Sequence, residues 1–132
     1  MRGVIHHIEI NVANLEKSRQ FWLPFLTALD YDLYQEWSAG FSMKLGDTYL
    51  VFVQTEDNYL SPSFHRKHNG LNHLAFHVAS RQELDHWRNW IHELNLKELY
   101  PQQYPYAGGQ DYQALYFEDP DRLTIELVYQ EV

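Results

Sequence analysis

Alternating polar and apolar residues predict a β-strand over residues 4–12. Its apolar side chains face one way, and its opposite face carries His7, Glu9 and Asn11. From Asn14, a residue suited to cap a helix, apolar residues recur at helical spacing as far as Leu29. Pro24 lies inside this stretch and is expected to kink or shorten the helix, because proline lacks a backbone N–H.

The rest of the chain alternates between strand, turn and helix patterns. Three short strand patterns follow the first helix, at residues 33–37, 40–45 and 48–54. A polar segment, 56–69, then leads to another alternating stretch at 71–78 and to a helix that starts with a capping box, Ser80 and Glu83. Three further strand patterns complete the chain, at residues 97–100, 112–118 and 123–129, the last two joined by a turn at 119–122.

The two halves have the same order of elements, one strand, one helix and three strands. When the halves are aligned, His7 matches His73 and Val51 matches Glu126. One such unit cannot cover both faces of its own sheet, so two are expected to pack together. The prediction is a single α+β domain over residues 1–132: two βαβββ modules, about 1–55 and 70–132, joined by the connector 56–69, form a curved mixed sheet around a metal-binding cleft.

His7, His73 and Glu126 are the candidate metal ligands. Glu126 lies between Ile125 and Leu127 in an apolar strand. A buried carboxylate without a partner is costly, so a cation or a strong hydrogen-bond donor is expected beside it. Two imidazoles and a carboxylate suit one divalent ion, Zn, Ni, Mn, Fe or Co, and leave positions open for substrate.

Other polar side chains are candidates for acid–base and substrate-binding roles beside such an ion. Glu9 and His77 are candidate acid–base residues, although Glu9 would also serve to orient a ligand imidazole. Residues that would contact a substrate are Asn11, Tyr112 and Tyr116. His6 lies on the other face of the strand and should face the helix or the rim, and the basic segment 65–68 is either a solvated loop or an anion-binding lip.

Composition narrows the classes of function. The chain is 45% hydrophobic and 16% aromatic, which is typical of a folded globule. It has no cysteine, so disulfides and thiolate metal sites are excluded, and its net charge of −8 argues against nucleic acid or an anionic membrane as partner. No apolar run approaches the roughly 18 residues of a membrane span and no signal-peptide pattern is present, so a cytoplasmic protein is expected.

Three stretches, 5–15, 70–78 and 116–126, resemble the vicinal-oxygen-chelate superfamily, which includes glyoxalase I, extradiol dioxygenases and bleomycin-binding proteins. The resemblance implies paired βαβββ modules, and its metal ligands map onto His7, His73 and Glu126. Glyoxalase I has a fourth ligand, a glutamate, where this chain has Val51, and epimerases of the superfamily place a glutamine nearby, for which Gln54 is off register. Members often form dimers, so a homodimer is expected.

The expected function is therefore that of a glyoxalase-family enzyme. It would need a divalent metal and would act on a small oxygen-chelating substrate as a lyase, isomerase or transferase. Two alternatives stay open at this point: a resistance protein of the same fold that binds and sequesters a small molecule, and a dioxygenase-type enzyme with non-haem iron.

Overall fold

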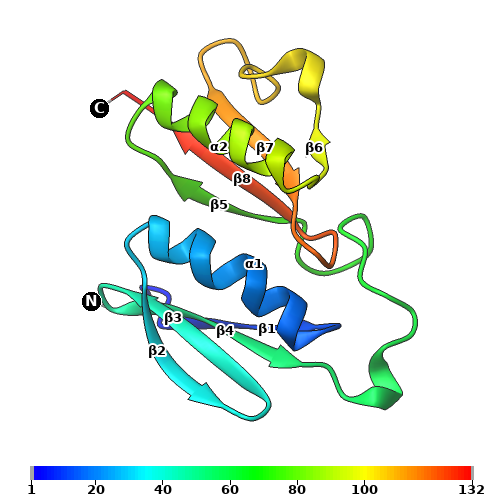
Figure 1. Cartoon of the computed structure of the whole chain (residues 1–132). Helices are drawn as coiled ribbons and strands as arrows, with labels where there is room; N and C mark the ends of the chain where they lie inside the picture. The colour runs from blue at the N-terminus through cyan, green and yellow to red at the C-terminus, as the bar shows by residue number, and fades with distance from the viewer. Residues whose placement is uncertain (1, 132) are drawn as a thin grey trace. The chain divides into compact units, whose positions relative to one another are not determined.

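The structure is a computed structural model that describes residues 2–131. The chain divides into two compact units, and the boundary between Ser63 and Phe64 falls inside the connector predicted at 56–69. Each unit holds one four-stranded mixed sheet and one α-helix (Figure 1). The predicted α+β fold of two βαβββ modules is confirmed, with one sheet in each module.

Unit 1 contains the first four strands and the first helix. In chain order its elements are β1 (His7–Val12), α1 (Leu15–Ala28), β2 (Asp32–Trp37), β3 (Gly40–Leu45), β4 (Thr48–Gln54) and the short 3₁₀ helix η1 (Asp57–Tyr59). The strand order is β1-β4-β3-β2, with β1 parallel to β4 and the other pairs antiparallel.

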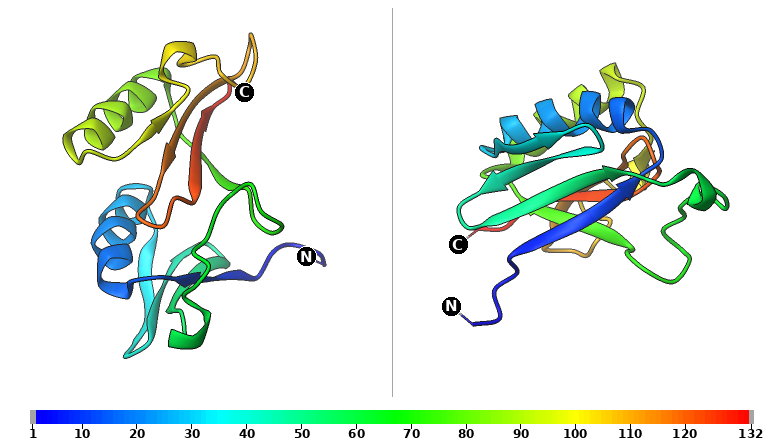
Figure 2. Two further views of the ribbon diagram at one scale, coloured as in Figure 1. Left: turned by 90° about the vertical axis from the view of Figure 1, so that its right-hand side faces the viewer. Right: turned by 90° about the horizontal axis from the view of Figure 1, so that it is seen from below.

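Unit 2 repeats this arrangement. Its elements are β5 (His73–His77), α2 (Arg81–Glu93), β6 (Glu98–Leu99), the 3₁₀ helix η2 (Pro101–Gln103), β7 (Gln113–Glu118) and β8 (Thr124–Tyr129). The strand order is β5-β8-β7-β6, and β5 is parallel to β8. In each unit the helix lies across one face of its own sheet (Figure 2).

The core of unit 1 lies between α1 and its sheet. Trp22 of α1 and Phe52 of β4 are fully buried, with ring centroids 4.8 Å apart. Phe41 of β3 stacks on Phe52, with ring centroids 5.0 Å apart. Burial of aromatic side chains is the largest favourable contribution to the stability of such a unit, because each side chain removes about 150–250 Å² of surface from water.

Helix α1 begins as predicted but does not end at its proline. The Asn14 side chain accepts a hydrogen bond from the Lys17 amide at 3.1 Å. The expectation that Pro24 would shorten the helix is wrong, since α1 continues to Ala28. Packing of the aromatic side chains on the sheet outweighs the one backbone hydrogen bond that proline removes.

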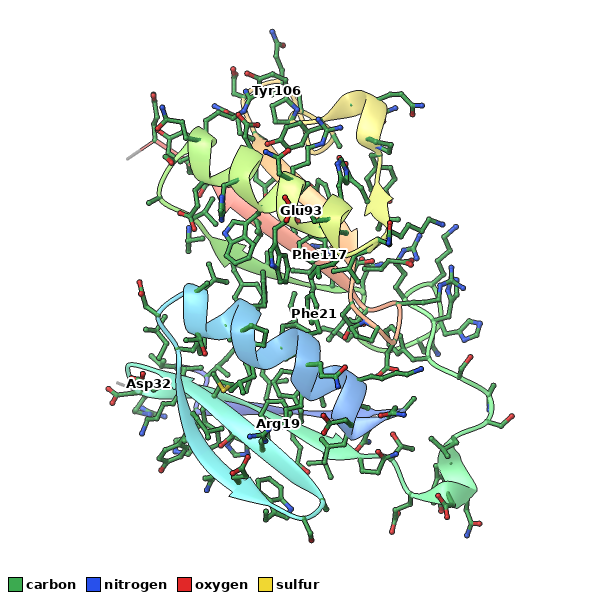
Figure 3. The ribbon with its side chains drawn as sticks, viewed as in Figure 1. Arg19, Phe21, Asp32, Glu93, Tyr106 and Phe117 are labelled. Carbon is green, nitrogen blue, oxygen red and sulfur yellow. The ribbon has the colours of Figure 1, made fainter. Side chains whose placement is uncertain are left out.

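Helix α2 carries the core of unit 2. Leu84, Trp87 and Ile91 are buried against the sheet, and Phe117 lies on β7 of that sheet (Figure 3). The predicted cap is present: the Ser80 hydroxyl accepts from the Glu83 amide at 3.0 Å. The Glu83 carboxylate accepts at 2.8 Å from the amide of Ala79, one residue before the N-cap.

The strand registers confirm that Val51 and Glu126 are equivalent positions. Glu9 of β1 pairs with Val51 of β4, and Ala75 of β5 pairs with Glu126 of β8. The predicted turn before β8 is also present, because the Asp119 carboxylate accepts from two amides within it, each at 2.8 Å. This turn fixes where β8 starts and therefore which face of the sheet carries Glu126.

Across residues 2–131, the helices are too short or too polar to cross a lipid bilayer.

Candidate functional site

Glu126 is a buried carboxylate in the middle of a buried strand. Only 3% of its surface is exposed, and its neighbours on the same face are Ala75 of β5 and Tyr116 of β7. The strand alternation aims this side chain away from the α2 side of the sheet, because Ile125 and Leu127 face the helix side. Removal of a carboxylate from water is expensive unless donors or a cation compensate for it.

Three side chains of unit 2 approach this carboxylate. The Tyr112 hydroxyl donates a hydrogen bond to Glu126 Oε2. On the other oxygen, His73 Nε2 lies 3.1 Å from Oε1. Tyr116, which is paired with Glu126 in the strand register, also interacts with the carboxylate through its hydroxyl.

Both tyrosines remain protonated donors over the neutral range. The hydrogen bond to Glu126 is the main cause that raises the pKa of Tyr112, with burial second. Burial comes first for Tyr116 and, together with the charge of Glu126, raises its pKa to about 12. A phenol beside a carboxylate resists ionisation because two negative charges would then face each other.

His73 presents one ring nitrogen to the carboxylate and the other to its neighbour in the chain. Its Nδ1 lies 2.7 Å from Asn72 Oδ1, an atom that can only accept. The proton therefore belongs on Nδ1, and Nε2 faces Glu126 Oε1 either as a lone pair or as part of an imidazolium. A neutral imidazole in this position places two electron-rich atoms together, an arrangement that a cation between them would stabilise.

The chemistry of this pair fits a divalent transition metal. An imidazole nitrogen and a carboxylate oxygen 3.1 Å apart can share one ion, given ligand distances of about 2.0–2.2 Å. Over residues 2–131, the structure has no group of three or more His, Cys, Asp or Glu side chains placed to hold a metal. Unit 2 thus offers two ligands.

The predicted third ligand, His7, lies in unit 1 at the start of β1. Its ring is exposed and stacks on Tyr49, with centroids 4.8 Å apart and planes 5° apart. His6 is exposed as well, and its Nδ1 lies 2.8 Å from Nδ1 of His7. His6 precedes the strand, which begins at His7, so strand alternation does not govern its direction.

The remaining candidates on β1 are exposed. Glu9 and Asn11 share the solvent-facing side of this strand. Opposite Glu9, Val51 is 4% exposed and has no donor atom for a metal. Gln54 is engaged at the start of α1, where it accepts from the Leu15 amide at 2.8 Å, so unit 1 has no counterpart of Glu126.

A cavity of about 220 Å³ adjoins Tyr112 in unit 2. It is lined by Ala75, Phe76, His77, Tyr112, Val128 and Gln130. The predicted acid–base residue His77 therefore borders a cavity that Tyr112, the hydrogen-bond donor to Glu126, also lines. A second cavity of about 540 Å³ is bounded by the loop of Tyr106 (Figure 3) and by the end of β8.

Sequence reasoning missed Gly108, which lies directly against both tyrosines. A Cβ atom at this residue would meet Tyr112 Cδ1 at 2.5 Å and the Tyr116 hydroxyl oxygen at 2.6 Å. The absence of a side chain therefore lets the rings reach Glu126. The only sequence signal was the run of small residues at 107–109.

The basic segment at 65–68 is tied to the sheet. Arg66 Nη1 lies 2.8 Å from Glu118 Oε2, and the Glu118 side chain is only 6% exposed. The guanidinium pairs with this buried carboxylate, so Arg66 does not lie in a fully solvated loop.

Comparison with known proteins places this chain in a family. The family model of the Glyoxalase/Bleomycin resistance protein/Dioxygenase superfamily matches residues 4–127. The chain belongs to this superfamily. The resemblance read from the sequence is thereby confirmed, and divalent-metal binding is common among superfamily members.

Individual relatives agree with this assignment. The uncharacterized protein YqjT of Bacillus subtilis (strain 168) is 45% identical over 124 residues, which cover 94% of this chain and 97% of YqjT. A proposed glyoxalase from Bacillus halodurans has a crystal structure with a TM-score of 0.96 and 50% identity, covering 98% of this chain and 97% of that one. Lactoylglutathione lyase from Agrobacterium tumefaciens shares the fold, with a TM-score of 0.64, 15% identity and coverage of 96% and 93%.

Proposed function

We propose that this superfamily member is a divalent-metal-dependent enzyme acting on a small molecule with two adjacent oxygen atoms, as a lyase, isomerase or transferase. The observation that carries this proposal is the approach of His73 Nε2 to within 3.1 Å of the buried Glu126 carboxylate. In the proposal, His73 and Glu126 hold the metal, and His7 is the third ligand. We also propose a homodimer, which sedimentation of the purified protein would test.

When bound, the metal would supply Lewis-acid chemistry by polarising a substrate oxygen. The chain's own residues would do the rest. Tyr112 and Tyr116 hold the carboxylate in place through their hydroxyls. His77 borders the cavity of about 220 Å³ and would take up or deliver a proton on a substrate held there.

The size and lining of this cavity favour a small substrate. Its volume of about 220 Å³ is below the roughly 300–1,000 Å³ of pockets for drug-sized ligands. Apolar Ala75 and Val128 line it together with polar His77, Tyr112 and Gln130. Glu9 and Asn11 of β1 are proposed as further acid–base and substrate-binding residues, and substitution of each would test this.

The decisive experiment is a metal titration of purified variants. Elemental analysis and calorimetric titration with Zn²⁺ and Mn²⁺ should give one ion per chain for the wild type and none for Glu126→Gln, because the amide cannot replace the carboxylate charge. The matched control is Glu93→Gln at the exposed end of α2 (Figure 3), which should bind as the wild type does.

Two results would refute the proposal: a wild type that takes up no divalent metal, or a Glu126→Gln variant with unchanged metal stoichiometry.

Turnover is tested separately. The metal-loaded protein should convert at least one compound in a panel of small molecules with adjacent oxygens. Tight ligand binding that survives a chelator, without turnover, would instead support a sequestering protein. Oxygen consumption that depends on added Fe²⁺ would support a dioxygenase.

A further inference from the structure

We infer that the residue immediately before each candidate ligand histidine, His6 in unit 1 and Asn72 in unit 2, sets the tautomer and ring orientation of that histidine. This inference rests on the proposed function in one respect only, namely that the Nε2 atoms then bind a metal. It is carried by two separate contacts to Nδ1, 2.8 Å in unit 1 and 2.7 Å in unit 2.

In unit 2 the direction of the hydrogen bond is fixed by a second contact. Asn72 Nδ2 donates to the backbone carbonyl of Arg66 at 3.4 Å, which leaves Oδ1 as the atom facing His73. Because an amide oxygen only accepts, His73 must donate from Nδ1. When the ring is neutral, the Nε2 atom then faces Glu126 with its lone pair, the state in which an imidazole binds a metal.

In unit 1 the same nitrogen of His7 is held by an imidazole instead of an amide. The two Nδ1 atoms are 2.8 Å apart, so a hydrogen bond between them needs one ring to donate and the other to accept. When His7 is the donor, its Nε2 carries a free lone pair. Stacking on Tyr49 at 4.8 Å, with planes 5° apart, resists rotation of the ring out of this orientation.

The repetition is the strongest argument for a role. His7 and His73 hold corresponding registers in the two sheets, opposite Tyr49 and Thr124. The preceding residue differs in chemical type between the halves, yet each contacts the same ring nitrogen and each is able to accept a hydrogen bond. A partner on the ring nitrogen that does not bind metal orients the ring and makes the ligand nitrogen more basic.

These positioning residues should affect metal affinity without being ligands themselves. Loss of such a partner typically weakens metal binding about 10–100-fold. We expect a loss of this size for Asn72→Leu and for His6→Leu. The exchanged variants, Asn72→His and His6→Asn, retain an acceptor and should stay within about threefold of the wild type.

The test has two independent measurements. Long-range ¹H–¹⁵N NMR of the metal-free protein, at a pH where imidazoles are neutral, should show the proton on Nδ1 of both His7 and His73. Asn72→Leu should abolish this preference at His73. Calorimetric titration with Zn²⁺ should then show the expected loss of affinity, whereas Asn69→Leu, an exposed change in the same loop, should bind as the wild type does.

The outcomes separate this inference from the proposed function. A proton found on Nε2 of His73 overturns the inference, and so does an Asn72→Leu variant with wild-type tautomer and affinity. A wild type that binds no Zn²⁺ but shows Nδ1 protonation refutes the metal proposal and leaves the tautomer assignment standing. Circular dichroism and thermal melting of each variant establish that it is folded before either comparison is made.

Discussion

Replacement of Gly108 by alanine tests whether the loop before β7 fixes the position of the Glu126 carboxylate. The added Cβ would lie 2.5 Å from Tyr112 Cδ1 and 2.6 Å from the Tyr116 hydroxyl oxygen, where ordinary contact begins at 3.4 Å. Gly108 does not have the positive φ that disfavours alanine, so the effect is steric alone. Either the loop or both rings must move by almost 1 Å.

The magnitude follows from two terms. Overpacking of a well-packed site costs about 1–3 kcal/mol. Displacement of Tyr112 also weakens a hydrogen bond to a charged group, worth about 1.5–3 kcal/mol. A movement of Tyr112 that relieves the overpacking also weakens its hydrogen bond, so the two costs do not apply in full at the same time. We therefore expect a total loss of about 2–4 kcal/mol in the free energy of unfolding.

Urea unfolding of four proteins measures this effect: wild type, Gly108→Ala, Tyr112→Phe and the double variant. In the Tyr112→Phe protein the hydroxyl is already absent, so Gly108→Ala cannot weaken its hydrogen bond to Glu126. The double-mutant cycle should therefore show a coupling of about 1–2 kcal/mol. Stability of Gly108→Ala within about 0.5 kcal/mol of the wild type, with no coupling, would contradict the account of this loop.

Two further predictions concern contacts elsewhere in unit 2. Arg66→Met leaves Glu118 buried beside only Arg122, 3.6 Å away, so urea unfolding should show a loss of about 2–4 kcal/mol, and Glu118→Gln in the same chain should recover part of it. Tyr104 donates to Asp85 and is the main cause that lowers the pKa of this carboxyl. A lowered folded-state pKa stabilises the protein above the unfolded-state pKa, and this stabilisation is lost as pH falls through the folded-state value. The melting temperature of Tyr104→Phe should therefore fall below that of the wild type at neutral pH and converge with it in acid; a gap independent of pH would refute this.

Most of the fold could be predicted from periodicity because each element buries one regular face. The bounds of β3 and β4 agree with their patterns residue for residue, and Asn14 and Ser80 cap the helices as expected. Pro24 was misjudged because a local rule was applied where tertiary packing decides. Such packing involves residues from several elements, which a pattern along one element does not reveal.

The candidate site was only partly accessible from sequence. An isolated carboxylate in an apolar strand correctly indicated that Glu126 needs a partner. The hydrogen bond from Tyr112 to Glu126 and the space that Gly108 leaves for the tyrosine rings depend on how a loop folds back on the sheet. No periodic pattern in the sequence predicts the conformation of that loop. The partner of Arg66 was not predictable for a similar reason, since a charge run in a connector usually faces water, but here one member reaches a buried partner on β7.

Val51 makes the two halves of the chain chemically different at equivalent positions. Its register equates it with Glu126, and it is as deeply buried. After a gene segment doubles, selection on chemistry can act on one half while the other half drifts toward better packing at the same site. In this chain the carboxylate lies in one half and an apolar side chain in the other, which makes Val51→Glu a direct way to ask what a protein with a carboxylate at both positions is able to bind.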